Sequence, residues 1–273
     1  MSISLRNAIV MILSVALIAG CDQPGRRATT PKATTSPATQ AGLLPSLSDD
    51  FEGTPLALFW LPGLAGSGRY EPGAVALTSE RARSGKSCVR ITVKEGDILQ
   101  TGDDGKETER AELDSGQHPL VGRDVWYGFS VYVPEDFPIV DDRLVIAQWK
   151  QADLQGSPLV AQRFRRGRHD LTIRAQDDRH VALPKLELGR WHDMIYHIRF
   201  AAGDDGRVQV WMNGRQVADV KGPVTLAAGG DRVYNKFGLY RDRWPAPMTI
   251  YFDNYAMDAG KSNVDPARFD ARP

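Results

Sequence analysis

The stretch VQVWMNGRQV, residues 208–217, decides the fold class. Val208, Val210 and Met212 occupy every second position before the dipeptide Asn213–Gly214, as apolar residues do in strands with one buried face, and Arg215–Gln216–Val217 follows it. An Asn-Gly pair between two such runs is typical of a two-residue hairpin turn, because both residues tolerate positive φ. The stretch therefore predicts two antiparallel strands joined by a tight turn.

Short alternating runs of the same kind recur along the chain, separated by turns rich in Gly and Asp. Outside the N-terminal segment, no stretch shows the 3.6-residue period of an amphipathic helix. We expect strands over Val89–Val93, Arg110–Leu113, Trp126–Val133, Leu144–Lys150, His169–Ala175, Trp191–Phe200, Arg207–Met212, Lys236–Tyr240 and Thr249–Met257. Many antiparallel strands at this spacing predict an all-β fold, a two-sheet antiparallel sandwich or jelly roll.

The N-terminal residues resemble a lipoprotein signal peptide. Arg6 supplies a basic start, and the apolar run that ends at Gly20 is too short to span a bilayer as a mature helix. The run closes with LIAGC, which resembles the bacterial lipobox, so residues 1–21 are expected to be a signal peptide with a lipid-modified Cys21. Acyl chains would then anchor the protein in the bacterial cell envelope, facing the periplasm or the cell surface. The alternative is a buried N-terminal helix with an incidental cysteine.

Residues 22–46 are rich in Thr, Pro, Ala, Gln and Gly and contain almost no large apolar residue. Such a segment cannot bury enough surface to fold, so it is predicted to be a flexible tether. Residues 47–273 have the right length for one substantial domain, which we expect to be a monomer. The chain has two cysteines, and if Cys21 is lipidated, Cys88 has no partner for a disulfide bond.

The formal net charge is zero, with 34 basic and 34 acidic residues. A polyanionic partner would therefore have to be attracted by a local patch rather than by the field of the whole protein. The run RFRRGR, residues 163–168, is such a patch, and its Arg165 is a candidate contact for an acidic polymer. His169 and His180 flank the patch and are further candidates for ligand contact. A nucleic-acid partner is not expected for a membrane-tethered protein outside the cytoplasm.

Several segments, taken in order, resemble a known family. Residues 189–214 resemble the back-sheet hairpin of concanavalin-like sandwiches, and Asn235–Arg241 resembles a "K-x-G-x-Y" strand. Arg110–Leu113 resembles an "R-[SA]-E-L" strand, and residues 147–150 stand where the family carries "Q-x-H", with Lys150 in place of His. Together the segments resemble the polysaccharide lyases grouped with heparin lyase I and glucuronan lyase, and the alginate lyases of the same jelly-roll fold. The resemblance covers most of residues 49–258 and implies a concanavalin A-like β-jelly roll with a concave substrate groove.

The resemblance also implies a reaction, the cleavage of a 4-linked uronic-acid-containing polysaccharide by β-elimination. Such a site must neutralise the uronate carboxylate, remove the proton at C5 and protonate the leaving O4. The period of two in a strand sorts the residues of three segments into core-facing and outward-facing sets. The outward-facing sets are Arg110 with Glu112, then Gln148 and Lys150 with Ile146, and finally Lys236 and Tyr240 with Gly238.

These residues can be assigned roles. Tyr240 is expected to act as base, acid or both, activated by a nearby Lys or Arg. Arg110 and Gln148 would clamp the substrate carboxylate, and Glu112 would orient Arg110 through a bidentate pair. Further substrate contacts are expected from Lys150, Lys236, Arg165 and Arg241. The alternatives are an ordinary sheet tyrosine at Tyr240 and a surface salt bridge between Arg110 and Glu112.

The remaining histidines divide into two groups. His118 follows the strand of Arg110 by one turn and is the best alternative base. His192 and His197 belong to the back-sheet hairpin by the resemblance, so structural roles are expected for both.

No cofactor is required for the proposed chemistry, although a structural calcium ion is an open prediction. Residues 51–53 and 251–254 resemble first and last strands that close such a site in many concanavalin-like sandwiches. The oxygen atoms of Glu52 and Asp253 would suit Ca²⁺. The alternative is a strand edge with two solvated carboxylates. No Cys/His spacing indicates a zinc site.

Two other functions compete with the lyase. A glycoside hydrolase on a similar sandwich needs two carboxylates flanking the scissile bond, and the E-x-D of residues 112–114 has no second Glu at the required spacing. A non-catalytic carbohydrate-binding lipoprotein of the same fold is the stronger alternative, because polar concave faces also serve binding. The type of polyuronate, endo or exo action and the stereochemistry of elimination stay open.

Overall fold

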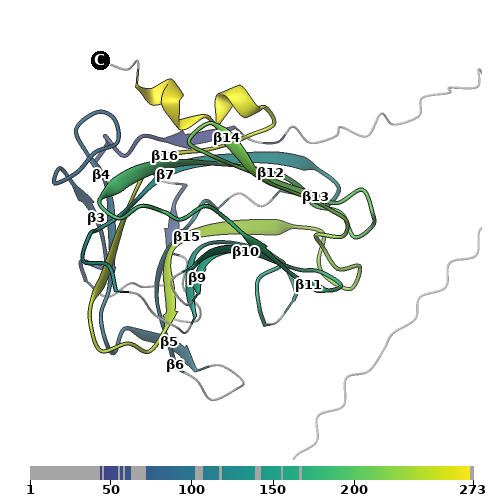
Figure 1. The fold of residues 1–273 in the computed structure, drawn as a ribbon, viewed down its shortest axis with the longest axis horizontal. Coiled ribbons are helices and arrows are strands. Elements are labelled where there is room, and N and C mark those ends of the chain that lie inside the picture. The colour runs from purple at the N-terminus through teal and green to yellow at the C-terminus, as the bar shows by residue number, and fades with distance from the viewer. Residues whose placement is uncertain are drawn as a thin grey trace, which may run out of the picture. The chain divides into compact units, whose positions relative to one another are not determined.

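Two antiparallel β-sheets, stacked face to face, make up the folded part of the chain (Figure 1). The computed structural model describes residues 44, 46–54, 56–57, 59–62, 72–101, 107–116, 119–138, 143–154, 156–165 and 168–270. All of these belong to one compact unit, Leu43–Pro273. The predicted signal peptide, its Cys21, most of the predicted tether and His118 lie outside the described residues. No helix in the described ranges has the length and apolar character needed to cross a membrane.

The first sheet has the strand order β14-β13-β12-β7-β16-β4-β3, and β1 pairs with β16. Its strands are β1 (Leu47–Asp49), β3 (Val75–Thr78), β4 (Cys88–Val93), β7 (Asp124–Val133), β12 (Arg190–Arg199), β13 (Arg207–Met212), β14 (Arg215–Lys221) and β16 (Met248–Asp258). Two 3₁₀ segments near the C-terminus, η1 (Lys261–Asn263) and η2 (Pro266–Phe269), lie against the outer face of this sheet (Figure 1).

The second sheet has the strand order β11-β10-β9-β8-β15-β6-β2, and β5 pairs with β6. Its strands are β2 (Leu61–Pro62), β5 (Ile98–Thr101), β6 (Glu107–Asp114), β8 (Leu144–Gln151), β9 (Val160–Arg165), β10 (Arg168–Arg174), β11 (Asp178–Ala182) and β15 (Val233–Asp242). The prediction of an all-β, two-sheet antiparallel sandwich is therefore confirmed. The three strands with candidate site residues, β6, β15 and β8, are direct neighbours in this sheet.

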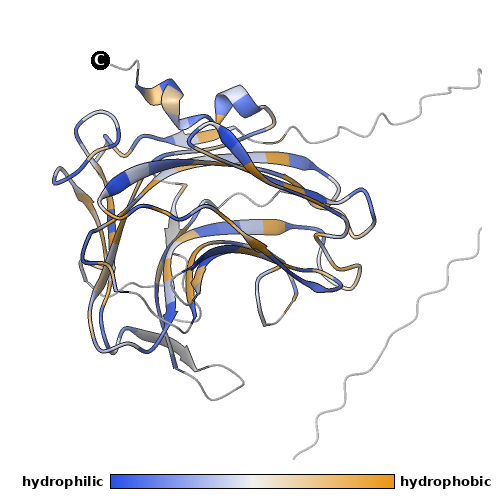
Figure 2. Cartoon of the chain, viewed as in Figure 1, coloured by the Kyte–Doolittle hydropathy of each residue, from blue (hydrophilic) through white to orange (hydrophobic). Residues whose placement is uncertain are grey.

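The hydrophobic core fills the space between the two sheets. Hydrophobic and hydrophilic residues are interspersed along the strands, because only one side of each strand faces the core (Figure 2). Phe129 of β7 stacks on Phe237 of β15 with ring centroids 6.1 Å apart, and Trp149 of β8 meets Tyr127 of β7 at 5.5 Å. Burying a side chain of this size contributes roughly 1.5–3 kcal/mol, so these contacts across the two layers hold the sheets together.

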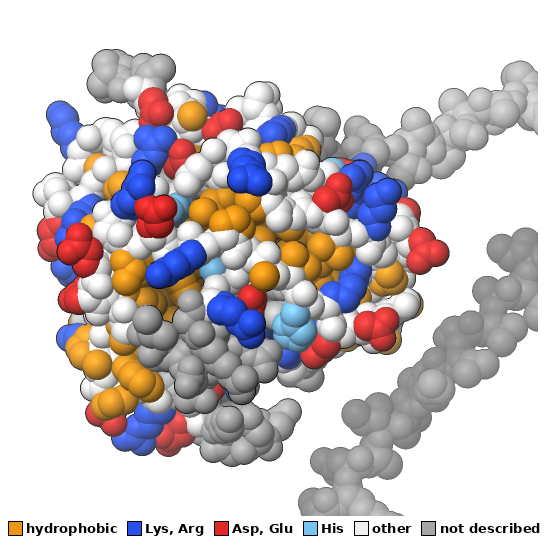
Figure 3. Space-filling model, viewed as in Figure 1, with side chains coloured by type: hydrophobic (Ala, Val, Ile, Leu, Met, Phe, Trp, Pro, Cys, Tyr) orange, Lys and Arg blue, Asp and Glu red, His pale blue; other side chains and the backbone are white. Residues whose placement is uncertain are grey.

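Charged groups are spread over the surface without a dominant sign. Figure 3 shows cationic and acidic side chains interspersed around a hydrophobic area on one face of the molecule. This mixture agrees with the zero net charge of the chain. Binding of a polyanion therefore depends on how a few cations are grouped locally.

The hairpin predicted from Asn213–Gly214 is present between β13 and β14. Met212 pairs with Arg215, and the two turn residues have φ values of 50° and 78°. Positive φ at both positions matches the right-handed twist of the flanking strands, which is why this dipeptide suits the turn. The Asn213 carboxamide also accepts a hydrogen bond of 2.9 Å from the Asp193 backbone N–H, which fixes the turn against β12.

A β-bulge separates the two halves of β15 where it pairs with β8, between Phe237 and Tyr240. Gly238 lies in this bulge with a φ of 143°, and a Cβ atom there would lie 2.3 Å from the Ala111 carbonyl oxygen. Only glycine fits such a close approach, and the bulge increases the local bend of the strand. The bulge has one consequence that the period of two did not predict. Ile146 joins the hydrophobic core instead of sharing the outward face with Gln148.

Candidate active site

Six of the predicted site residues lie together on the outward face of the second sheet. We call this set the polar face, and its members are Arg110, Glu112, Gln148, Lys150, Lys236 and Tyr240. Tyr240 of β15 is directly opposite Arg110 of β6, and Lys236 is directly opposite Gln148 of β8. Directly opposed side chains in antiparallel strands are about 5 Å apart at Cβ, so one sugar residue can touch several of them.

Glu112 is the buried centre of the polar face, with a side chain that is 0% exposed. Gln148 Nε2 donates a hydrogen bond of 2.5 Å to Glu112 Oε1, and Arg110 Nε lies 3.3 Å from Glu112 Oε2. Burial raises the pKa of Glu112, while the nearby charges of Arg110 and Lys236 oppose that rise. One carboxylate therefore contacts both Arg110 and Gln148, and its approach to Arg110 is a single contact rather than the predicted bidentate pair.

Tyr240 is held between two guanidinium groups. The Arg110 Cζ atom lies 3.9 Å from the centroid of the Tyr240 ring, and Arg143 Nη1 donates a hydrogen bond of 2.7 Å to the Tyr240 hydroxyl oxygen. Asp242 fixes Arg143, because its Oδ2 accepts from the Arg143 backbone N–H at 3.1 Å and its Oδ1 lies 3.3 Å from Arg143 Nε. A cationic donor aimed at the phenol oxygen stabilises negative charge on that oxygen.

Arg143 is a residue that the sequence patterns missed. It precedes β8 without belonging to an alternating run, so the spacing in the sequence gave no signal for it. Tyr234 was also missed, although it shares the outward face with Lys236 and lies opposite Lys150. Burial and the charges of Asp114 and Glu112 raise the pKa of Tyr234 to about 12, so this second phenol stays protonated.

Lys150 lies at the edge of the polar face, opposite Tyr234. It is half-buried, and burial together with the charges of Lys236 and Arg110 lowers its pKa. The charge of Glu112 acts in the opposite direction. Two lysines and an arginine thus concentrate positive potential above one buried carboxylate, which suits an anionic ligand.

Arg241, which was predicted to contact substrate, does not lie on the polar face. It points to the core side of β15, is 1% exposed, and pairs with the fully buried Glu109 at 2.6 Å. Its guanidinium also donates to the carbonyl oxygens of Trp244 and Ala246. The reason is the alternation of the strand, because Arg241 shares a face with Leu239 and not with Tyr240. Its guanidinium is therefore engaged inside the sandwich by Glu109 and two backbone carbonyls.

Two other predicted residues cannot be placed. His118 lies outside the described residues, as does the side chain of Arg165. The neighbouring Arg163, on β9, is described and lies on the outward face. It pairs with Val145 of β8, and its Nε donates a hydrogen bond of 2.9 Å to Thr172 Oγ1. Val145 in turn pairs with Tyr240, so Arg163 extends the row that begins at Arg110.

Three of the remaining histidines are engaged away from the polar face. His169 lies between the sheets with its Nδ1 on the Pro184 carbonyl at 2.7 Å, and burial lowers its pKa to about 4. His192 and His197 lie on β12 of the first sheet, as expected, and His197 stacks on Trp126 at 4.3 Å. His180 is exposed on β11, opposite Thr172, and so lies on the outward side of the second sheet.

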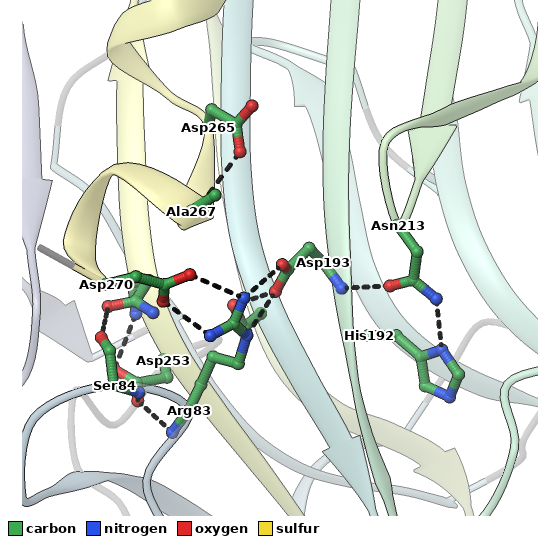
Figure 4. A network of polar contacts seen from close by, with 11 residues as sticks. Arg83, Ser84, His192, Asp193, Asn213, Asp253, Asp265, Ala267 and Asp270 are labelled. Atoms are coloured by element: carbon green, nitrogen blue, oxygen red, sulfur yellow. Dashed lines mark hydrogen bonds and ion pairs between the residues drawn. The ribbon is translucent and has the colours of Figure 1, made fainter.

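The predicted calcium ligands lie on the other sheet. Glu52 Oε1 accepts from the backbone N–H groups of Lys86 and Ser87. Asp253 Oδ2 accepts from the Arg83 backbone N–H at 2.8 Å, as Figure 4 shows. Asp253 is fully buried, and burial, reinforced by the charge of Glu52, raises its pKa to about 7. The Arg83 guanidinium points away, to Asp193 and Asp270, as Figure 4 shows.

This donor set fits Ca²⁺ in kind. It offers two carboxylates and the Asn254 carboxamide oxygen, and among the described residues the hydrogen bonds to the Asp253 carboxylate come from backbone N–H groups. Calcium prefers oxygen ligands of this type but takes six to eight of them, so carbonyl groups and water would have to supply the rest. Within the described residues, no group of three or more His, Cys, Asp and Glu side chains is arranged to hold a metal ion.

A family model described as "Polysaccharide lyase" matches residues 56–256 of the chain. The search of curated proteins found no match to the sequence of this chain. Among solved structures, an endo-β-1,4-glucuronan lyase from the fungus Trichoderma reesei is similar, with 19% identity, a TM-score of 0.61, and coverage of 77% of this chain and 98% of that one.

Two further solved structures share the fold. The cellulose-induced protein Cip1 is 15% identical, with a TM-score of 0.54 and coverage of 78% of this chain and 97% of its own. The alginate lyase AlgAT5, from polysaccharide lyase family 7, is 15% identical, with a TM-score of 0.51 and coverage of 72% and 93%. At these identities the likeness concerns the jelly-roll fold.

Proposed function

The chain belongs to the polysaccharide lyase family, and from this premise we propose that it cleaves a 4-linked uronic-acid-containing polysaccharide by β-elimination at the polar face. The observation that carries the proposal is the convergence of Arg110, Gln148 and Tyr240 around the buried Glu112 on three adjacent strands. An arginine and an amide beside a phenol are the groups that this elimination needs.

The first requirement of the reaction is neutralisation of the substrate carboxylate. Removing the C5 proton places more negative charge on an anion, so fixed donors must stabilise the charge that develops. Arg110 is oriented by Glu112 and by the ring of Tyr240, which leaves its terminal nitrogens to meet a uronate. Lys150 and Lys236 add positive potential next to this position. Because these side chains are already held in place, little reorganisation is needed when substrate binds.

The second requirement is proton transfer at Tyr240. In the proposed step Tyr240 reacts as the phenolate, having first released its own proton to solvent. Its oxygen takes the C5 proton, the C4–O4 bond breaks with its electron pair on O4, and a C4=C5 double bond forms. The leaving O4 then receives a proton, from Tyr240 itself or from water. The hydrogen bond from Arg143 supports this role, because a cationic donor stabilises the negatively charged form of the Tyr240 oxygen.

Hydrolysis fits the same residues poorly. A glycosidase needs two carboxyl groups on either side of the scissile bond, each able to reach it. Glu112 is fully buried beneath Arg110 and Gln148, and the Asp114 carboxylate accepts from the Gly116 backbone N–H at 2.9 Å. Both carboxylates are buried, so neither is exposed to a sugar chain on this face.

The competing proposal is a carbohydrate-binding lipoprotein without catalytic activity. The two are separated by incubating the purified domain with a panel of acidic polysaccharides and following near-ultraviolet absorbance. A lyase produces an unsaturated uronate that absorbs there, whereas a binding protein does not. Absorbance that rises with any polyuronate supports the lyase, and binding without absorbance change across the panel would favour the alternative.

We propose that the enzyme works while attached to the membrane of the bacterial cell envelope. The support is the sequence of residues 1–21, with a lipobox-like ending at Cys21, followed by the polar segment 22–46. A lipid anchor with a flexible tether would let the domain sample polymer near the membrane surface. Fractionation of cells that express the full chain or its Cys21→Ser variant tests this, since only the first should partition with membranes.

We also propose a structural calcium ion held by Glu52, Asp253 and the Asn254 carboxamide. The support is the kind of atom that these side chains offer, since Glu52 and Asp253 have carboxylate oxygens and Asn254 has a carboxamide oxygen. When bound, the ion would compensate the charge of Asp253 and tie β16 to the loop after β1. It would take no part in the elimination, because these residues lie on the first sheet and the polar face is on the second.

A further inference from the structure

A second polar hollow lies on the outer face of the first sheet, away from the polar face. Its volume is about 650 Å³, within the size range of small-molecule sites. Neighbouring strands β4 and β16 supply much of its lining, and their other sides face the core. Its polar lining comprises three cationic side chains, two carboxylates and three hydroxyl groups: Arg81, Arg90, Lys94, Asp97, Asp136, Thr92, Thr249 and Tyr251.

Arg81 is held rigidly at the wall of this hollow by aromatic rings. Its Cζ atom lies 4.6 Å from the centroid of the Tyr132 ring and 5.7 Å from that of Tyr251. Its Nη1 donates a hydrogen bond of 2.8 Å to the Tyr132 hydroxyl oxygen. Trp191 continues the same row, with its ring 5.5 Å from that of Tyr132. An arginine fixed in this way loses little side-chain entropy when it binds an anion.

The charges around the hollow leave two cations available. Arg90 is already paired with Glu80 at 3.1 Å, and Glu80 also accepts from the Tyr251 hydroxyl at 3.0 Å. Asp97 accepts from the Lys94 backbone N–H, and it takes no salt bridge from the Lys94 side chain. Among the described residues, therefore, neither Arg81 nor Lys94 has a carboxylate partner.

The other lining groups suit a sugar more than a simple ion. Thr92 Oγ1 and Thr249 Oγ1 share a hydrogen bond of 2.9 Å, and each hydroxyl keeps further capacity to donate or accept. The Tyr251 ring is half of an aromatic pair with Tyr132, with centroids 5.9 Å apart. Both of these rings are buried beneath Arg81, so the groups that can meet a ligand are the hydroxyls and the two cations without a carboxylate partner. Hydroxyl groups beside cations match a sugar that carries a carboxylate.

We infer that this hollow is a second binding site for an acidic sugar chain, with Arg81 and Lys94 as its carboxylate contacts. The inference rests on the proposed function for the identity of the polymer. The site is on the opposite sheet from the polar face, so it takes no part in cleavage. It would retain a long chain near the enzyme between cleavage events, by the effective-concentration effect of two linked sites.

The test measures binding separately from cleavage. Titration calorimetry of a Tyr240→Phe domain with a uronic-acid hexasaccharide is expected to give two binding sites per protein. The double substitution Arg81→Gln and Lys94→Gln should remove one of them, weakening it by at least about ten-fold, as expected for the loss of charged hydrogen bonds. The matched control is Arg190→Gln with Lys221→Gln, two exposed cations of the same sheet outside the hollow, which should keep both sites.

Kinetics of the active enzyme give a second readout. The Arg81→Gln, Lys94→Gln double variant should raise KM for long polymer while leaving kcat, and KM for a tetrasaccharide, unchanged. One site in the parent protein, or two unaltered sites in the double variant, would overturn the inference without touching the lyase proposal. Equal binding of a neutral glucan of the same length would overturn the acidic class of ligand. Failure of the lyase proposal shows instead as the absence of unsaturated product with intact binding.

Discussion

Arg143 donates a hydrogen bond of 2.7 Å to the hydroxyl oxygen of Tyr240, although 97 positions separate the two residues in the chain. The pairing of β8 with β15 brings them together, and Asp242 at the end of β15 holds Arg143 in place. The phenol of the polar face thus has its own cationic donor, which is the relationship from which its proposed role in proton transfer follows.

Substitution of Arg143 should slow the chemical step. We expect Arg143→Gln to lower kcat by about 10²-fold, in the range seen when one donor to a developing charge is removed, with a smaller change in KM. Arg143→Lys should recover part of the activity, because it keeps the charge but loses the fixed geometry. Steady-state kinetics of both variants, beside the exposed control Arg190→Gln, measure this. A kcat for Arg143→Gln equal to that of the parent would contradict the role.

Substitution of Glu112 should separate activity from stability. Burial raises the folded-state pKa of Glu112 above its unfolded value. Folding therefore favours the protonated form, and the ionised form lowers the free energy of unfolding at neutral pH. We expect Glu112→Gln to keep or increase the melting temperature at pH 7. Loss of the pairing with Arg110 should lower kcat/KM by about 10-fold or more, because the carboxylate clamp is no longer oriented. Unchanged kcat/KM, or a large fall in melting temperature, would count against this account of Glu112.

The bulge at Gly238 should be intolerant of any side chain. A Cβ atom there would meet the Ala111 carbonyl oxygen at 2.3 Å, and the φ of 143° is one that L-residues rarely adopt. We expect Gly238→Ala to reduce the free energy of unfolding by about 2–4 kcal/mol, from steric clash and backbone strain together. Gly73→Ala is the matched control, since Gly73 also has positive φ but no atom within 4 Å of the added carbon, and should cost only about 1 kcal/mol. Urea denaturation compares the two, and equal losses would show that the close contact is unimportant.

The stability of the metal-free protein should depend on pH through Asp253. Burial raises the folded-state pKa of Asp253 to about 7 from its ordinary value of 3.8, so the stability it contributes is full below pH 4 and is lost as the pH rises towards 7. In that window the loss approaches roughly 1.4 kcal/mol per pH unit, and Asp253→Asn should remove it. Thermal unfolding in EDTA between pH 4 and pH 8 measures the slope for both proteins.

Calcium should reverse this loss if the proposed ion binds. The melting temperature of the parent should rise with added Ca²⁺ at pH 8 and much less at pH 5, because the ion needs the ionised carboxylate. Asp253→Asn should be insensitive at both values. A parent protein whose melting temperature ignores Ca²⁺ at pH 8 would refute the calcium site while leaving the pH slope intact.

Periodicity alone predicted the regular parts of the fold. Each of the nine predicted strands coincides with a strand of the structure, and the Asn213–Gly214 turn has the expected backbone angles. Strands such as β1, β2 and β3 were missed because two to four residues are too few to show an alternating pattern. Ile146 was misplaced for a different reason, since a bulge shifts the pairing of β8 and a period of two cannot anticipate it.

The candidate site was predictable to the extent that it follows strand alternation. Arg110, Gln148 and Tyr240 were expected on one face, and pairing of β6, β15 and β8 brings them together. Arg143 could not be found this way, because it lies before its strand and reaches Tyr240 only through the fold. Arg241 was wrongly expected to meet substrate, because its charge suggested a ligand while its buried partner Glu109 lies on a strand distant in sequence.

The most direct test of the central claim is the rate at which a polyuronate yields unsaturated product with Tyr240→Phe compared with Tyr234→Phe. Both phenols belong to β15 and point to the same side, but only Tyr240 receives the Arg143 hydrogen bond and faces Arg110. The account predicts that Tyr240→Phe loses the near-ultraviolet signal while still binding polymer, and that Tyr234→Phe retains substantial turnover. Full turnover by Tyr240→Phe would contradict it.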